Sequence, residues 1–306
     1  MTLSRSMIRL LVSLAEGASG LSELAKKTGL SQSRCSQLCS QLEKLHLVAR
    51  RREGMKTRLR LADSPPAASF KEMYFGRQHT PFADFLYGLK LDLLQLLIFE
   101  PKSVATLAKL TGSSKPSVWR SLKALRSRSL VWKEKEKYRF TTKAYPSITK
   151  FLYNLRTFTP ENKLIVWKFN GEEIFHTRNE ALATQLTGLN RYKDFGVEVF
   201  TIDALCVSPP RTLAKEEIFV HSLLEIGDEP RVLAVAIAFY LKNAVKDSKL
   251  SFPLEKYDLT AKFAEFKKTV DAFIKNHNAQ ITNSLLPSIT GEHIARTLGV
   301  YQVKDV

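Results

Sequence analysis

Residues 24–33 read LAKKTGLSQS and residues 107–116 read LAKLTGSSKP, so two closely related decapeptides lie 83 positions apart. Of the 25 positions from 24 to 48, nine are identical to their counterparts in 107–131. The register between the two copies is unbroken over this length. An internal repeat of this kind indicates that one supersecondary unit occurs twice in the chain.

Each decapeptide predicts a short helix, a turn and the start of another helix. Gly29 and Gly112 fit the positive φ with which a helix commonly ends. Ser31 and Ser114 fit the N-cap of the helix that follows, and Pro116 suits its first turn. We also expect a helix before each decapeptide, over 4–17 with Ser4 as N-cap and over 90–101. The short helices themselves are expected to be capped by Ser22 or a neighbour and by Ser103.

The helix that follows each decapeptide is amphipathic, and a basic segment comes after it. Its apolar face is expected to hold Cys35, Leu38, Cys39, Leu42 and Leu45 in the first copy, and Val118, Leu122 and Leu125 in the second. Residues 47–62 and 130–144 then alternate around a short polar tip, as a β-hairpin does. Three helices and a hairpin make a winged helix-turn-helix.

The pattern LSELAKKTGLSQSRCSQLCSQLEKLHLV resembles the winged-helix transcriptional regulators of bacteria and archaea. The resemblance covers residues 4–62, here the first repeat, and about 83–146, here the second repeat. It implies a winged-helix fold and DNA binding. Winged helices also serve as protein-binding modules, so an assembly scaffold remains an alternative.

Positive charge is confined to the N-terminal half of the chain, whose net charge is +17 overall. Residues 1–62 hold 12 basic and 4 acidic residues, and residues 63–160 hold 17 and 7, giving +8 and +10. The remaining residues hold 18 basic and 19 acidic residues, a net of −1. Such asymmetry indicates a polyanionic partner, and we expect double-stranded DNA.

The polar faces of the two amphipathic helices favour DNA over a protein partner. Their Gln, Ser, Arg and Lys side chains are able to donate hydrogen bonds to base edges in a major groove. The residues expected to read bases are Gln32, Ser33, Arg34, Ser36, Gln37, Lys115, Ser117 and Arg120. The residues expected to contact phosphates, mostly from the hairpins, are Arg50, Arg51, Arg52, Lys56, Arg58, Arg60, Lys123, Lys133, Lys135, Lys137 and Arg139. The alternative for the hairpins is a solvated charged surface.

The second copy differs from the first on its exposed face. Trp119 occupies the position of Ser36, where it would contact sugar or a thymine methyl, or pack at an interface, which we favour. Glu134 and Glu136 dilute the positive charge of the second hairpin. We therefore expect the first repeat to read sequence, and the second to lend phosphate contacts or pack against a neighbour.

The expected fold class is mainly α with small β elements. The expected domains are a winged helix at 1–62, a Pro-rich linker at 63–81, a second winged helix at 82–146, a connector helix at 147–160 and an α+β domain at 161–306. In the last domain, residues 163–178 predict a hairpin around Asn170-Gly171. We expect a helix at 179–188, a strand at 196–209 and helices at about 213–226, 230–246, 259–277 and 290–298.

The sequence predicts no enzyme, no metal site and no cofactor. The histidines are isolated, Glu172-Glu173 and Glu216-Glu217 suit a solvated turn and a helix start, and no Gly-rich phosphate loop or nucleophile elbow occurs. Glu265-Phe266-Lys267, a Glu-x-Lys tripeptide such as nucleases use, lies on a predicted helix. Cys35 and Cys39 are expected to be small buried hydrophobes, with a redox switch as the alternative. A nucleic-acid enzyme remains a rival.

The run ALCVSPPRTLAKEEIFVHSLLE at 204–225 is similar to the C-terminal domain of type IV abortive-infection antitoxins. This implies an autorepressor of a toxin–antitoxin pair as an alternative function. The longest apolar run, at 232–241, is half of what a membrane span needs. Our leading expectation is a cytoplasmic, nucleoid-associated, sequence-specific regulator, and specifically a repressor. Its C-terminal domain is expected to bind a second copy, a protein partner or a small effector, and no membrane.

Overall fold

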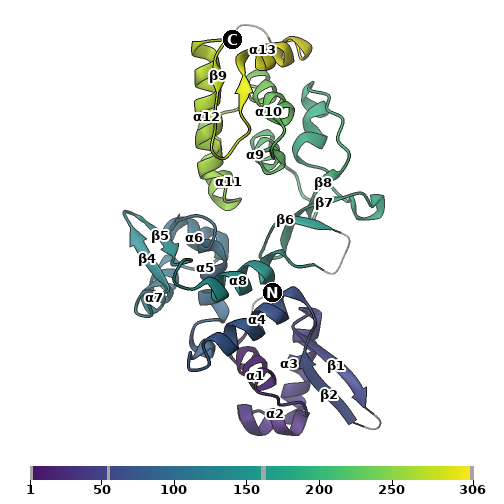
Figure 1. The fold of residues 1–306 in the computed structure, drawn as a ribbon, viewed down its shortest axis with the longest axis vertical. Helices are drawn as coiled ribbons and strands as arrows, with labels where there is room; N and C mark the ends of the chain where they lie inside the picture. Colours follow the sequence, from purple (N-terminus) through teal and green to yellow (C-terminus); the bar gives the residue numbers. More distant parts are fainter. Residues whose placement is uncertain (1–2, 54–55, 160–162, 304–306) are drawn as a thin grey trace. The chain divides into compact units, whose positions relative to one another are not determined.

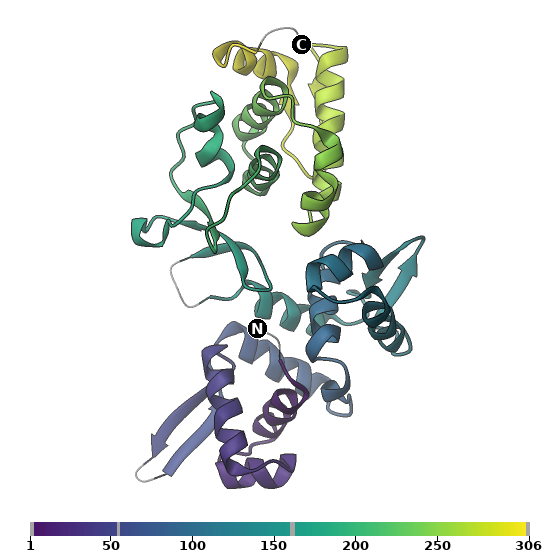
Figure 2. The same ribbon diagram turned by 180° about the vertical axis from the view of Figure 1, so that it is seen from behind.

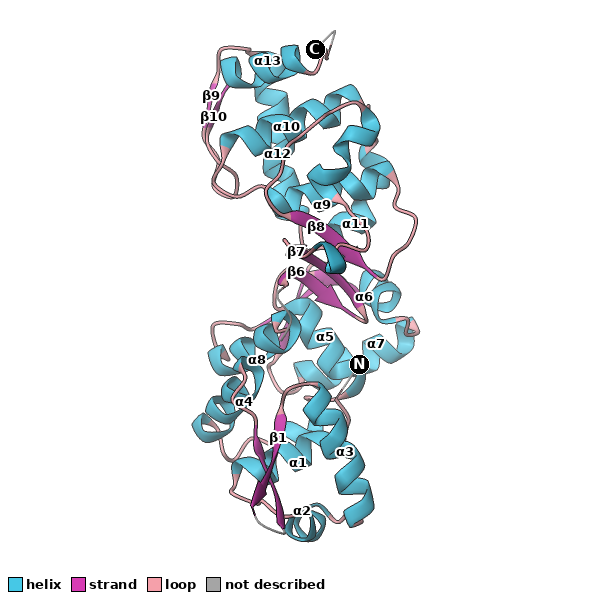
Figure 3. Ribbon diagram, turned by 90° about the vertical axis from the view of Figure 1, so that its right-hand side faces the viewer, coloured by secondary structure: helices cyan, strands magenta, loops and turns pink. Residues whose placement is uncertain are grey.

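The computed structural model describes residues 3–53, 56–159 and 163–303, and the chain divides into two compact units, Met1–Phe158 and Thr159–Val306. Helices make up 54% of the structure, and every sheet is small and antiparallel, as Figure 3 shows. The predicted class, mainly α with small β elements, is confirmed. In the part of the chain that the structure describes, no helix is long and apolar enough to cross a membrane.

The first repeat consists of three helices and a hairpin (Figure 1). These are α1 (Arg5–Ala15), α2 (Leu21–Thr28), α3 (Gln32–Lys44), β1 (Val48–Glu53) and β2 (Lys56–Leu61). The two strands pair from Val48 opposite Leu61 outward. Leu10, Leu24 and Leu42 are fully buried among the three helices. Burial of the apolar face of each helix against the others provides the main stabilisation of such a small unit.

The second repeat has the same order of elements with one strand added. Its elements are α5 (Gly88–Leu97), β3 (Lys102–Ser103), α6 (Val104–Thr111), α7 (Lys115–Arg126), β4 (Val131–Glu134) and β5 (Lys137–Phe140). The strands form one sheet in the order β3-β5-β4. The second hairpin is shorter than the first, and both are seen from behind in Figure 2.

The turns repeat along with the helices. Gly29 and Gly112 adopt φ of 72° and 63°, and the Ser31 and Ser114 side chains accept hydrogen bonds from backbone N–H groups of the next helix, as predicted. Ser4 and Ser103 also cap their helices as expected. The cap of α2, expected at Ser22 or a neighbour, is Gly20, which has no side chain to cap with. There Glu23 instead accepts a hydrogen bond from the Ser19 N–H at 3.0 Å.

The segment 63–81 is not an extended linker. Ser64 caps a helix, α4 (Pro65–Gly76), that packs against α8 (Pro146–Thr157), the expected connector helix. The rings of Phe70 and Phe151 meet at 5.4 Å, and Lys150 pairs with Glu72 at 2.6 Å. The prolines suit the first turn of α4 because their missing N–H groups have no intrahelical partner there.

Further contacts hold the two repeats together within the first unit. A 3₁₀ turn, η1 (Phe82–Asp84), carries Asp84, whose carboxylate pairs with Arg5 at 2.7 Å and with Arg128 at 3.2 Å. The Gly88 N–H donates to the Leu3 carbonyl at 3.0 Å. Since these contacts come from both repeats, packing and not tether length sets the distance between α3 and α7.

The second unit combines a sheet of order β6-β7-β8 with a set of helices. The elements are β6 (Leu164–Phe169), β7 (Glu172–Thr177), η2 (Glu180–Leu182), η3 (Gly188–Phe195), β8 (Ala204–Ser208), α9 (Lys215–Glu225), α10 (Pro230–Lys242), η4 (Asp247–Lys249), α11 (Ser251–Lys256), α12 (Thr260–Lys275), β9 (Gln280–Ile281), β10 (Ile289–Thr290) and α13 (Gly291–Val300). The hairpin around Asn170-Gly171 and the four predicted helices are present. The structure adds α11, the short strands β9 and β10, and η4.

Two predictions for this unit were wrong. Residues 179–188 form no α-helix, because Gln185 and Thr187 bond to the backbone of β8, at Val207 and Leu205. The expected strand at 196–209 is ordered as a strand only at Ala204–Ser208, the part that pairs with β7. In both cases pairing with residues distant in the sequence overrides the local pattern.

Candidate nucleic-acid interface

Helix α3 is held by its buried face and its cap, which leaves a polar face outward. Cys35, Leu38, Cys39 and Leu42 are buried. Burial raises the pKa of the Cys39 thiol to about 11, against an opposing effect of Arg50. The thiol is therefore protonated at neutral pH and is a poor nucleophile. The prediction that these cysteines act as small buried hydrophobes is confirmed by their burial.

The predicted base-reading residues of the first repeat lie on the outward face of α3. Gln32, Ser33, Arg34 and Gln37 are exposed, and Ser36 is half-buried. The Arg34 guanidinium donates to the Gln37 side chain at 3.2 Å. This contact orients two donor-bearing side chains on adjacent turns of the helix. Their role in reading bases stays a prediction.

Arg50 joins the first hairpin to α3. Its guanidinium pairs with Glu43 at 2.8 Å and donates to the Ser36 carbonyl at 3.1 Å and to Ser40 Oγ at 2.6 Å. Sequence reasoning placed Arg50 among the phosphate contacts and missed these bonds, because strand β1 returns to α3 only in the folded repeat. In the structure Arg50 positions the hairpin on the helix.

Four other basic residues of the first hairpin are exposed, namely Arg51, Arg52, Arg58 and Arg60. Arg60 forms a two-bond pair with Asp63, at 3.0 and 2.6 Å, so part of its charge is neutralised locally. Lys56 belongs to β2, but its side chain lies outside the described residues. Cationic side chains on such a hairpin are suited to phosphate contacts.

Helix α7 presents an aromatic ring within a basic face. Lys115, Arg120 and Lys123 are exposed, and Ser117 is half-buried. Trp119 is 52% exposed, and the Lys123 ammonium lies 5.5 Å from the centre of its ring. The described residues thus give Trp119 a cation neighbour on its own helix, and a partner beyond the chain stays a prediction.

The second hairpin carries both signs of charge. Lys133, Lys135 and Arg139 are exposed, and Lys137 is half-buried. The Lys133 ammonium lies 3.8 Å from the Glu136 carboxylate within the hairpin. The expected dilution of positive charge by Glu134 and Glu136 is therefore present at this tip, and both glutamates are exposed.

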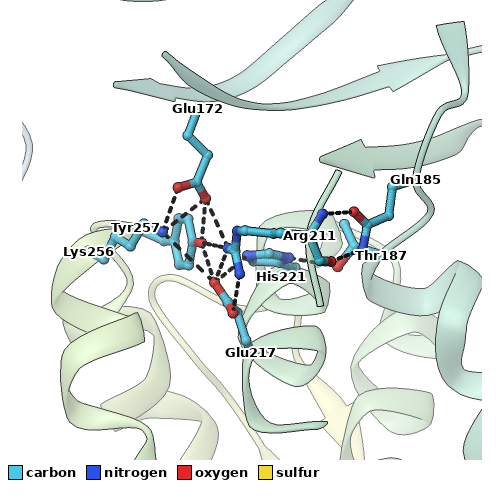
Figure 4. A network of polar contacts seen from close by, with 8 residues as sticks. All are labelled: Glu172, Gln185, Thr187, Arg211, Glu217, His221, Lys256 and Tyr257. Carbon is cyan, nitrogen blue, oxygen red and sulfur yellow. Dashed lines mark hydrogen bonds and ion pairs between the residues drawn. The ribbon is translucent and has the colours of Figure 1, made fainter. Parts of the chain in front are cut away.

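The second unit contains a network of half-buried charged groups, shown in Figure 4. The Arg211 guanidinium donates to Glu217 at 2.8 Å and to Glu172 at 3.1 Å. Lys256 donates to Glu172 at 2.7 Å, and the Tyr257 hydroxyl lies 2.7 Å from Glu217 and 2.8 Å from Glu172. The network joins β7, the segment after β8, α9 and the end of α11.

The charges of this network are mutually compensated. Burial alone would raise the pKa values of Glu172 and Glu217, but hydrogen bonds from Lys256 and Arg211 outweigh it. The pKa of Glu217 falls to about 2. Burial lowers the pKa of His221 to about 3, so the ring is neutral at pH 7. Its Nδ1 lies 2.6 Å from the Thr187 hydroxyl, and the ring is fully buried.

This arrangement corrects one expectation. Glu172 was expected at a solvated turn but belongs to the network, while Glu217 lies in the first turn of α9 as expected and its network contacts were missed. No local pattern reveals this, because the partners come from segments up to 85 residues apart. The compensated charges and the buried ring fit a structural clamp between sheet and helices. Among the described residues, no group of three or more His, Cys, Asp or Glu is placed to hold a metal.

A cavity of about 490 Å³ in the second unit gathers exposed apolar side chains. Leu164, Phe200 and Ile202 line it and are 69%, 85% and 89% exposed. Asp203, Asp228 and Glu229 are among its polar lining residues. Exposed apolar groups that gather in this way are typical of binding surfaces.

No family model, no curated protein and no solved structure matches the chain.

Proposed function

We propose that the first unit, Met1–Phe158, here called the N-terminal unit, contains two winged helix-turn-helix repeats that bind double-stranded DNA. We further propose that the chain is a sequence-specific transcription regulator. The carrying observation is that both amphipathic helices, α3 and α7, turn their donor-bearing faces to solvent beside exposed basic hairpins. A helix of this kind enters a major groove, while the hairpin contacts the backbone beside it.

The distribution of charge supports the proposal. The excess of +18 lies in residues 1–160, which contain both repeats, while the remaining residues carry −1. The exposed cations of this half include Arg51, Arg52 and Arg58 on one hairpin and Lys135 and Arg139 on the other. Release of counterions from DNA by such side chains provides affinity that depends on salt and not on sequence.

The fixed packing of the repeats supports binding of both to one DNA molecule. Because α4 packs on α8 and Asp84 pairs with Arg5 and Arg128, the two helices keep one spacing. A regulator with a fixed spacing requires a fixed distance between the sequences it reads, about 34 Å or a multiple where both helices face one side of the duplex.

We also propose that the second unit, Thr159–Val306, here called the C-terminal unit, binds a second copy, a protein partner or a small effector. The exposed Leu164, Phe200 and Ile202 around one cavity support this role. Repression and a cytoplasmic, nucleoid-associated location are parts of the same proposal.

The test is to incubate the full-length protein with sheared genomic DNA and to sequence the fragments that it retains. We expect a shared motif, and affinity for it that falls by about 10³-fold or more between about 50 and 200 mM salt if six or more phosphates are contacted. Retention without a shared motif would contradict sequence reading. Affinity that barely changes with salt would contradict the phosphate contacts.

A further inference from the structure

Helix α7 carries a row of side chains that its counterpart lacks. Lys115, Trp119 and Lys123 are spaced by four residues, so they lie along one line of the helix surface. All three are exposed. At the equivalent positions, 83 residues earlier, α3 has Gln32, Ser36 and Ser40. We call the three residues of α7 the Trp119 row. Lysines replace Gln32 and Ser40 of α3, and an indole replaces the hydroxyl of Ser36.

The hairpins of the two repeats make different contacts with these two rows. In the first repeat, Arg50 donates to the Ser36 carbonyl and to Ser40 Oγ, so a hairpin side chain lies on the row of α3. The equivalent residue of the second repeat is Lys133, and its ammonium lies beside Glu136 in its own hairpin. Trp119 stays 52% exposed, which is unusual for the largest apolar side chain.

We propose that the Trp119 row binds an unpaired nucleobase of DNA, with the indole stacked on the base and Lys115 and Lys123 on the flanking phosphates. The proposal rests on the proposed DNA binding of the N-terminal unit. It assigns the second repeat to a region where the duplex is open, next to the paired sequence read by α3.

The chemistry of the indole favours a base face over a base edge. Indole has a single N–H donor and no acceptor, so it reads the edge code of a groove poorly in comparison with Arg or Gln. Its flat face gains most from stacking, and every base offers such a face. In a closed duplex the neighbouring bases cover that face, so stacking on Trp119 requires an unpaired base.

The surrounding charges suit a nucleic acid strand. Lys115, Arg120, Lys123 and Arg126 all lie on α7 and are exposed. The Lys123 ammonium lies 5.5 Å from the ring centre. When a base stacks on the indole, it displaces the Lys123 ammonium from the ring. The ammonium then contacts a phosphate, and attraction between two charged groups replaces attraction to the ring. A protein partner that covers the row has to neutralise or desolvate its two lysines, with Arg120 and Arg126 nearby on the same helix.

The test compares affinities of the full-length protein for three probes of one sequence. The probes are a closed duplex, the same duplex with an unpaired bubble of about six nucleotides, and the single strand. We expect the wild type to bind the bubble about tenfold more tightly than the closed duplex, with quenching of tryptophan fluorescence. Trp119→Ala should remove this preference by lowering the affinity for the bubble about tenfold, with a much smaller change for the closed duplex.

The matched control is Trp132→Ala. Trp132 belongs to β4 of the same repeat, is 44% exposed and pairs across the hairpin with Arg139. This variant should keep the preference for the bubble, and Trp119→Phe should keep part of it. Because both tryptophans are about half exposed, the variants should keep a single cooperative thermal unfolding transition within a few degrees of that of the wild type.

Each contrary result has a distinct meaning. A wild type that binds bubble and closed duplex equally overturns the inference, while its binding to the closed duplex upholds the proposed function. An equal loss for all probes in Trp119→Ala assigns the ring to the duplex and also overturns it. A changed oligomeric state in Trp119→Ala, with DNA affinities intact, assigns the ring to a protein interface and overturns it too. Absence of binding to every probe overturns the proposed function itself.

Discussion

Helices α3 and α7 have the same scaffold and different surfaces. Ser31 and Ser114 cap them, Gly29 and Gly112 precede them with φ of 72° and 63°, and Leu42 and Leu125 are fully buried at equivalent positions. Even the residues after the helices agree, since His46 and Ser129 adopt φ of 54° and 57°. The repeat therefore preserves what the fold requires.

The outward residues of the two helices share little. Arg34 and Gln37 of α3 correspond to Ser117 and Arg120 of α7, and Ser36 corresponds to Trp119. Because these side chains add little to the packing, they are free to differ without loss of the fold. One scaffold thus carries two different surfaces. We therefore expect equivalent substitutions to have similar effects in the core and different effects on the outward faces.

The largest effect is expected for the two equivalent core leucines. Leu42→Ala and Leu125→Ala each remove a fully buried side chain and leave a cavity. Each should lower the free energy of unfolding of the N-terminal unit by about 3 kcal/mol. Chemical denaturation of the full chain measures both. A loss below about 0.5 kcal/mol in only one variant would show that the two cores are not equivalent.

The next effect distinguishes the faces. Arg34→Ala should weaken binding to the closed duplex by about 1–3 kcal/mol and relax the sequence preference at one base pair, because a bidentate donor is lost. Ser117→Ala, at the equivalent position of α7, should weaken it by less than about 0.5 kcal/mol. Titration of labelled duplexes that differ at single base pairs measures both. Equal losses would mean that both repeats read sequence.

The sequence predicted the repeated scaffold well because its determinants are local. A Gly that ends a helix, a Ser that caps the next and an apolar face of period 3.6 all act within a few residues. The hairpin around Asn170-Gly171 was predictable for the same reason. The cap of α2 and the positive φ of His46 and Ser129 escaped, since Gly is the residue type that usually marks such a conformation.

What could not be predicted depends on residues that meet only after folding. Arg50 was expected on phosphates and lies on α3, because β1 returns along that helix. The segment 63–81 was read as a linker from its prolines, yet Phe70 has Phe151 as a partner. In the second unit, pairing with β8 replaced the helix expected at 179–188. The exposure of the polar face of α3 was predictable, and its internal bonds were not.

A third test concerns the turns, where the repeats should again agree. Nothing lies within 4 Å of a Cβ built on Gly29 or Gly112, so Gly→Ala there costs only the strain of a positive φ. Each variant should lose about 1 kcal/mol of unfolding free energy. Ser129→Gly is the opposite change and should gain about as much, because φ at Ser129 is 57°. Thermal unfolding measures all three, and a loss on Ser129→Gly would refute the argument.

The smallest effect is expected at a position where the two hairpins carry side chains of opposite charge. Arg51 and Glu134 are equivalent residues on β1 and β4, and both are exposed. Arg51→Gln should weaken DNA binding by about 0.5–1 kcal/mol and lower the slope of log affinity against log salt by about one, because one phosphate contact is lost. Glu134→Gln removes a charge that repels the phosphates, and it should strengthen DNA binding by less than about 0.5 kcal/mol. The change should be uniform across sequences, since phosphates carry no sequence information. If Glu134→Gln instead left the affinity and the salt slope unchanged, the second hairpin would lie away from the phosphates, and the two repeats would differ in their contact with DNA as well as in their outward faces.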